Sequence, residues 1–101
     1  MLENFKGYQF LLADNWFDFL NLNEYYNKPI KYLEIVCSCG ANIISVAKTY
    51  GNHNDSLIYG IDPYEDYDDY DEYKSKQPII YNCFNENIKN ANIDSKIKLL
   101  R

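Results

Sequence analysis

The stretch KYLEIVCSCGANIISVAKTYG, residues 31–51, decides the fold that the sequence predicts. Residues 32–37 are an almost continuous apolar run with a single acid, Glu34, which is typical of a strand buried inside a parallel sheet. The turn VCSCG follows, and apolar residues then recur at helical spacing over residues 40–50, with Gly51 as the C-cap. A strand, a tight turn and a helix in this order predict one unit of an α/β protein.

The segments on either side continue this alternation. Upstream, apolar spacings of three and four predict an amphipathic helix over residues 15–26, capped by Asp14 and ended before Pro29. Downstream, residues 57–61 predict a second buried strand, Pro78 begins a helix that continues through residue 91, and residues 96–100 predict a third strand. The order predicts one α/β domain with a parallel sheet.

Composition excludes several classes of partner and site. The 101 residues carry a net charge of −5, and their lysines are scattered, which argues against binding nucleic acid or an anionic membrane surface. No apolar run reaches the length of about 18 residues that a spanning helix needs, and the N-terminus lacks a secretory pattern. Three cysteines predict buried free thiols rather than a disulfide framework or a metal site, and a cytoplasmic location.

Two features lie at the carboxyl ends of neighbouring predicted strands, where open α/β sheets bind ligands. The turn before Gly40 leads into a helix N-terminus, whose backbone N–H groups favour an anionic group. Asp62 follows the next strand, about 20 residues beyond Gly40, where an acid can accept hydrogen bonds from ribose hydroxyls. Together they predict a nucleoside-cofactor site. The plainer alternatives are that Gly40 only allows close helix packing and that Asp62 only caps a turn before Pro63.

The stretches YLEIVCSCGANIISVAKTYG (residues 32–51) and LIYGIDPYEDY (residues 57–67) resemble the opening half of class I S-adenosylmethionine-dependent methyltransferases. The segment DNWF, residues 14–17, is similar to a helix that precedes this core in the small-molecule and sugar branch. The resemblance covers residues 14–101 and is most specific over residues 33–64. It implies a Rossmann-like three-layer sandwich, here shortened to about three parallel strands with flanking helices. Nicotinamide dehydrogenases fit less well, because G-x-G-x-x-G is absent.

The resemblance assigns three cofactor-binding residues. Glu34 matches the acid in the first strand that helps to organise the methionine end of S-adenosylmethionine. Gly40 matches the last glycine of the turn, and Asp62 matches the acid that binds the ribose. One position departs from the family: its first turn glycine falls at Val36, whose branched side chain disfavours a positive φ and predicts weakened cofactor binding.

The run DPYEDYDDYDEYK, residues 62–74, carries seven carboxylates before its first lysine. Mutual repulsion predicts a solvated, loosely ordered loop. A cation-binding loop and a lid over the acceptor substrate are the functional alternatives, although the glycine and spacing of an EF-hand are absent.

The resemblance covers the cofactor-binding half of the family's fold, whereas acceptor binding and any catalytic base come from its later segments. We therefore expect either a methyltransferase-like protein of unknown acceptor, active only with the other half supplied by another chain, or a non-catalytic remnant or interaction module of the same fold. No catalytic residue is assigned. Because no fourth strand would cover residues 32–37, that strand becomes a sheet edge. We expect a homodimer, or a complex with a partner chain, across this edge.

Overall fold

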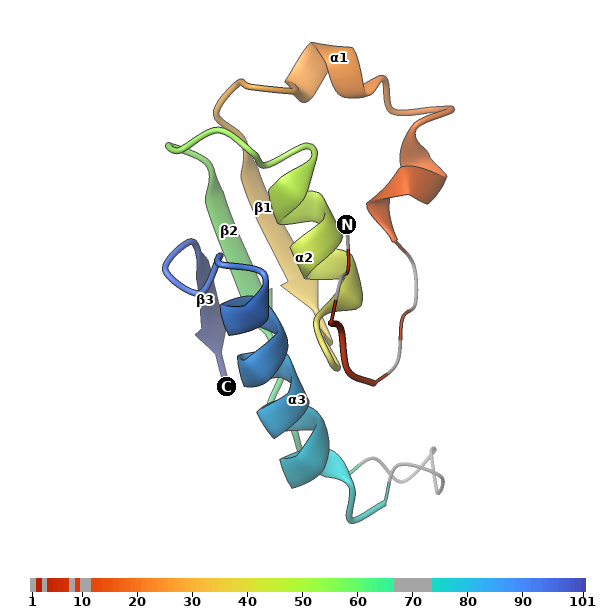
Figure 1. The fold of residues 1–101 in the computed structure, drawn as a ribbon, viewed down its shortest axis with the longest axis vertical. Helices are drawn as coiled ribbons and strands as arrows, with labels where there is room; N and C mark the ends of the chain where they lie inside the picture. Colours follow the sequence, from red (N-terminus) through yellow and green to blue (C-terminus); the bar gives the residue numbers. More distant parts are fainter. Residues whose placement is uncertain (1, 3, 8, 10–11, 67–73) are drawn as a thin grey trace.

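The computed structural model of the chain describes residues 2, 4–7, 9, 12–66 and 74–101, so most of the acidic run, residues 67–73, lies outside the described residues. In chain order the elements are the 3-10 turn η1 (Ala13–Trp16), α1 (Leu22–Tyr25), β1 (Lys31–Ile35), α2 (Ala41–Lys48), β2 (Leu57–Ile61), α3 (Gln77–Asn90) and β3 (Ile97–Leu100) (Figure 1). The alternation of strands and helices from residue 31 onward confirms the predicted α/β class.

The three strands form one open, parallel sheet in the order β1-β2-β3, with β1 at one edge. Lys31 pairs with Leu57 and Ile35 with Ile61, and on the other side of β2, Ile58 pairs with Ile97. The carboxyl ends of β1 and β2 therefore lie side by side. This register places the β1–α2 turn next to the residues that follow β2.

Helices α2 and α3 both cover the same face of the sheet (Figure 1). This follows from topology, because two successive right-handed crossovers that advance in one direction place their helices on one side. The main core fills the space between these helices and the sheet, and its most buried side chains are Ile43, Ile44, Ile58 and Phe84. On the other face, Leu33, Ile35, Leu57 and Leu100 are between 43% and 70% exposed. Within the described residues, the fold thus has two layers, a sheet and one layer of helices, and not the three layers expected from the sequence, because both crossover helices lie on one face.

The predicted helix over residues 15–26 is wrong. The structure has η1, a turn, and the short helix α1 instead, and Asp14 lies inside η1 rather than capping a helix. The interruption has a tertiary cause, because the Tyr50 hydroxyl donates to the backbone carbonyl of Leu20 at 2.6 Å. Asn21 then starts α1 as its N-cap, accepting a hydrogen bond from Asn23 N at 3.1 Å.

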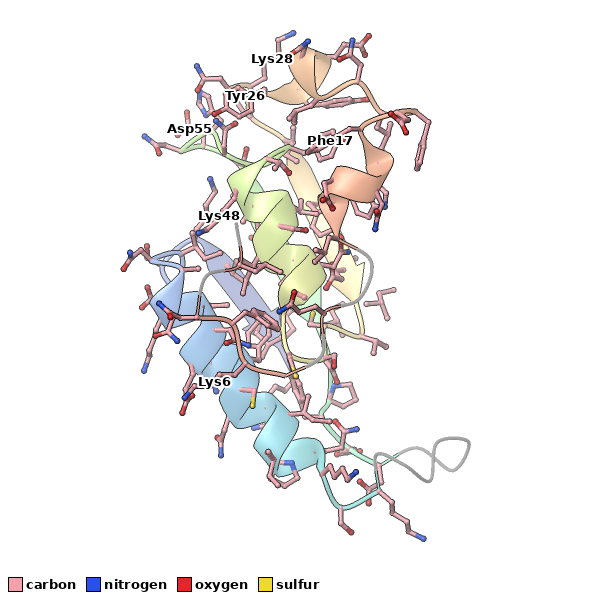
Figure 2. The ribbon with its side chains drawn as sticks, turned by 45° about the vertical axis from the view of Figure 1, so that its right-hand side comes forward. Lys6, Phe17, Tyr26, Lys28, Lys48 and Asp55 are labelled. Atoms are coloured by element: carbon pink, nitrogen blue, oxygen red, sulfur yellow. The ribbon has the colours of Figure 1, made fainter. Side chains whose placement is uncertain are left out.

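A second, smaller cluster holds this N-terminal region against α2. Ala13, Val46 and Tyr50 form its buried centre. The Tyr50 ring lies 6.1, 6.0 and 5.7 Å from the rings of Trp16, Phe17 and Tyr25, and Phe17 is labelled in Figure 2. Such tilted and edge-on ring pairs stabilise a contact beyond their buried area.

The segment around Lys6 is fastened separately to α3, near the labelled Lys6 in Figure 2. The Asn87 side chain accepts from Lys6 N at 2.9 Å and donates to Lys6 O at 2.8 Å and to Cys39 O at 2.9 Å. Asn87 thus ties the N-terminal segment to the β1–α2 turn. No helix within the described residues is both long and apolar enough to cross a membrane.

Candidate functional site at the carboxyl edge of the sheet

The turn between β1 and α2 contains three residues in the left-handed region at alternate positions. Val36, Ser38 and Gly40 have φ values of 67°, 52° and 93°. The turn is closed by hydrogen bonds from Val36 N to Ile61 O at 2.8 Å and from Gly40 N to Cys37 O at 2.9 Å. Glycine adopts this conformation readily, whereas other residues adopt it at a cost. Three of the five turn residues therefore have a left-handed φ, although only the last of them is glycine.

Gly40 is required here for two reasons. Its φ of 93° is left-handed, and a Cβ atom at this position would lie 3.0 Å from the Phe84 ring of α3. Gly40 is also the N-cap of α2, and its carbonyl accepts from Ile44 N at 2.9 Å. The predicted glycine thus serves both the turn and the packing of α3 against it, as the plainer interpretation of Gly40 expects.

Val36 is the unusual member of the turn. A β-branched residue with a positive φ is a genuine outlier, because its side chain crowds the backbone in that region. The Val36 side chain is 50% exposed, so its packing compensates for only a small part of this strain. Backbone strain that persists at the end of a strand is a reason to look for function at that position.

Asp62 lies just beyond β2 and binds the same turn. Its side chain is 1% exposed; Oδ2 accepts from Ser38 N at 3.0 Å and Oδ1 accepts from Tyr64 N at 2.8 Å. The Tyr64 hydroxyl donates to Ser38 O at 2.8 Å, and burial raises the pKa of this phenol. The carboxylate and the tyrosine therefore join the two loops that follow β1 and β2, and we call Ser38, Asp62 and Tyr64 the loop clasp.

Glu34 is the second acid of this region and is 8% exposed on β1. Its Oε1 accepts from the Tyr32 hydroxyl at 2.7 Å and from Asn42 Nδ2 at 2.6 Å. Burial raises the pKa of Glu34, opposed by these two hydrogen bonds. Asn42 Oδ1 is buried and has no hydrogen-bond partner among the described residues. The first turn of α2 and β1 thus share a cluster that is rich in acceptors.

The two cysteines of the turn are confirmed as buried thiols that form no disulfide. Cys37 and Cys39 are buried and Cys83 is half-buried, and none of the three forms a disulfide. Burial, followed by the charges of Glu34 and Asp62, raises the pKa of Cys37 to about 12, so this thiol stays protonated. Within the described part of the chain, no three histidine, cysteine, aspartate or glutamate side chains gather as metal ligands.

The structure brings the predicted site residues together around one turn. Gly40 ends the turn, Asp62 binds its centre through Ser38, and Glu34 lies on the strand that leads into it and binds Asn42 of α2. The sequence analysis did not identify Ser38, Tyr64 or Asn42 as members of this site. Nothing in the local sequence distinguishes them, because each acquires its partner through the packing of β1 against β2 or α2.

The fold defines the class of the protein as α/β, with an open parallel sheet whose carboxyl edge carries this turn. Comparison with known proteins adds no closer relationship: no family model matches the chain, and neither a curated protein nor a solved structure matches it significantly.

Proposed function

We propose that the chain is the cofactor-binding half of a Rossmann-like, class I methyltransferase-type fold, and that it binds S-adenosylmethionine at the carboxyl edge of β1 and β2. One observation supports this proposal above the others. The position where the resemblance places the family's first turn glycine is Val36, and Val36 has the backbone conformation of a glycine. A left-handed φ at Val36 supports the proposal, because glycine is the residue that adopts this conformation most readily.

The residues present fit the cofactor unequally. Glu34 and the unpaired Asn42 Oδ1 are acceptors for the ammonium group of a methionine moiety, although both are buried, and the α2 N-terminus beside them favours its carboxylate. Asp62 is the acid for the ribose hydroxyls, but the loop clasp buries it and both of its oxygens already accept backbone hydrogen bonds. Ribose binding therefore requires Tyr64 to move. We expect weak affinity for this reason.

A second candidate is a non-catalytic interaction module with the same fold. The loop clasp favours it, because Asp62 already supplies the carboxylate that satisfies Ser38 N. Methyl transfer needs chiefly a donor and an acceptor held in line, and no residue is assigned to either proton transfer or acceptor binding. The polar groups of the loop clasp form hydrogen bonds with one another without a ligand, which is what a purely structural role requires.

Isothermal titration calorimetry with S-adenosylmethionine and its demethylated product separates the two candidates. For cofactor binding, Asp62→Asn should weaken affinity by roughly tenfold to a hundredfold, because the ribose loses hydrogen bonds to a charged group worth about 1.5–3 kcal/mol. Asp55→Asn is the matched control, since Asp55 is exposed in the loop that precedes β2, at the opposite edge of the sheet. It should leave affinity unchanged.

Val36→Gly completes the experiment. If the branched side chain limits the approach of the cofactor, the glycine variant should bind more tightly than the wild type. Absence of binding heat at millimolar ligand in both the wild type and Val36→Gly would contradict cofactor binding and leave the interaction module.

A further inference from the structure

The free edge of β1 has a defined hydrogen-bonding pattern. Leu57 N donates to Ile30 O and Val36 N donates to Ile61 O, each at 2.8 Å. In a parallel ladder these two bonds mean that the even-numbered residues of β1 direct their backbone groups toward β2. Lys31, Leu33 and Ile35 therefore direct both N–H and C=O away from the sheet. No strand in the described residues pairs with this edge.

The same three residues also direct their side chains to the uncovered face of the sheet. Leu33 is 55% and Ile35 is 70% exposed, although both are apolar residues in the interior of a strand. Natural sheets protect such edges with proline, bulges or charges, and β1 has neither proline nor bulge. Lys31 is the only charge of β1 on this face, because Glu34 faces α2.

We propose that a second copy of this chain pairs with β1 in antiparallel orientation, with the two-fold axis at Leu33. In this register Leu33 lies opposite its own symmetry mate, and Lys31 lies opposite Ile35 of the second copy. The backbone groups of all three residues point outward. Each residue can therefore donate one hydrogen bond to the residue opposite it and accept one from it, as in a hydrogen-bonded antiparallel pair. The two three-stranded sheets join into one six-stranded sheet.

The side-chain pairs of this register are compatible with a second copy as the occupant. Tyr32 lies opposite Glu34 of the second copy on the helix-covered face, and no two like charges lie opposite each other. A two-fold axis one residue later would place the two Glu34 side chains directly opposite, which is destabilising. The contact is self-complementary and closed, which is the requirement for a symmetric dimer. The proposal does not depend on cofactor binding.

The test is sedimentation equilibrium of the full chain at several concentrations in physiological salt, which screens the charge of −5 on each copy. The wild type should approach twice the chain mass of 12.0 kDa. Leu33→Lys places two lysines on the axis and should raise the dimer dissociation constant by roughly tenfold or more, since like charges replace an apolar pair. Leu100→Lys is the matched control, because Leu100 is 53% exposed on the same face but lies on β3.

The outcomes are distinct. Loss of the dimer in Leu33→Lys and its retention in Leu100→Lys supports the proposal. A monomeric wild type at millimolar concentration overturns it and favours a different partner chain. Loss of the dimer in both variants overturns it in favour of packing between sheet faces, and retention in both overturns it in favour of another surface.

A second variant addresses the backbone directly. Leu33→Pro removes an N–H group that points away from β2, so it should preserve the hydrogen bonds between β1 and β2. The variant should keep the wild-type circular dichroism spectrum and lose the dimer. A dimer that survives in this folded variant contradicts pairing along β1.

Discussion

Replacing Val36 by glycine should not destabilise the protein, although the same change at an ordinary strand position does. The left-handed φ of 67° costs a branched residue about 2 kcal/mol, which glycine does not incur. Against this gain, glycine loses about 0.7 kcal/mol through the greater freedom of the unfolded chain. Removing a half-exposed valine side chain forfeits about 0.8 kcal/mol of burial.

These terms leave Val36→Gly more stable by about 0.5 kcal/mol, equivalent to a rise of about 3 °C in Tm for a domain of this size. At an extended position with a negative φ, the strain term is absent and the same substitution costs about 1.5 kcal/mol. The two expectations differ by about 2 kcal/mol, which is well above the precision of a denaturation experiment.

Urea and thermal unfolding followed by circular dichroism measure this difference. Val36→Ala is the control, because alanine keeps the Cβ atom and hence most of the strain while losing the packing of the two methyl groups. We expect the order of stability to be glycine, then valine, then alanine. If the glycine variant is less stable than the alanine variant, as at a regular strand position, Val36 is not held in the left-handed conformation.

Two further predictions concern the groups around the turn. Because burial raises the pKa of Glu34 in the folded state, the contribution of Glu34 to the free energy of unfolding should be greatest below its ordinary pKa near 4.5 and fall as pH rises through the folded pKa. Glu34→Gln should flatten this pH dependence and raise the free energy of unfolding at pH 7 by about 1 kcal/mol, because the glutamine amide can donate to Asn42 Oδ1. An unchanged pH profile of urea unfolding would contradict this assignment. Tyr64→Phe removes the hydrogen bond from the Tyr64 hydroxyl to Ser38 O. It should lower the free energy of unfolding by about 1 kcal/mol and accelerate amide exchange at Ser38. Tyr26→Phe, at a 51% exposed position, is the control, and equal exchange rates in the two variants would exclude the loop clasp.

The order of the core elements was predictable because local pattern and tertiary environment agree there. Residues 57–61 are apolar on both sides of the chain and end at an acid and a proline, and β2 occupies the same residues. The helix over residues 15–26 failed for the opposite reason. Its apolar spacing is helical, but the Tyr50 hydroxyl, 30 residues away in sequence, binds the Leu20 carbonyl. A periodicity argument contains no information about such a contact.

The candidate site was predictable at the residues that the backbone requires and unpredictable at those that tertiary contacts select. Gly40 and Asp62 follow from the ends of two adjacent strands, and the structure places them at one turn. The Tyr64 hydroxyl finds Ser38 only because β1 and β2 are neighbours in register. The sequence analysis noted that Val36 disfavours a positive φ, but only the structure gives it one.

Asp62 is where the two proposed functions make opposite demands, and this makes it the most informative residue of the chain. In the free protein its carboxylate satisfies Ser38 N and Tyr64 N in a buried position, so it stabilises the turn without any ligand. A ribose that binds Asp62 must compete with Tyr64 for that carboxylate, so tight closure of the loop clasp and tight cofactor binding oppose each other. If Asp62 serves only the turn, its substitution changes stability alone. If it serves the cofactor, affinity changes as well, and weakening the clasp at Tyr64 should raise that affinity even as it lowers stability. Measured together, stability and affinity therefore distinguish a structural acid from a binding acid at the same position.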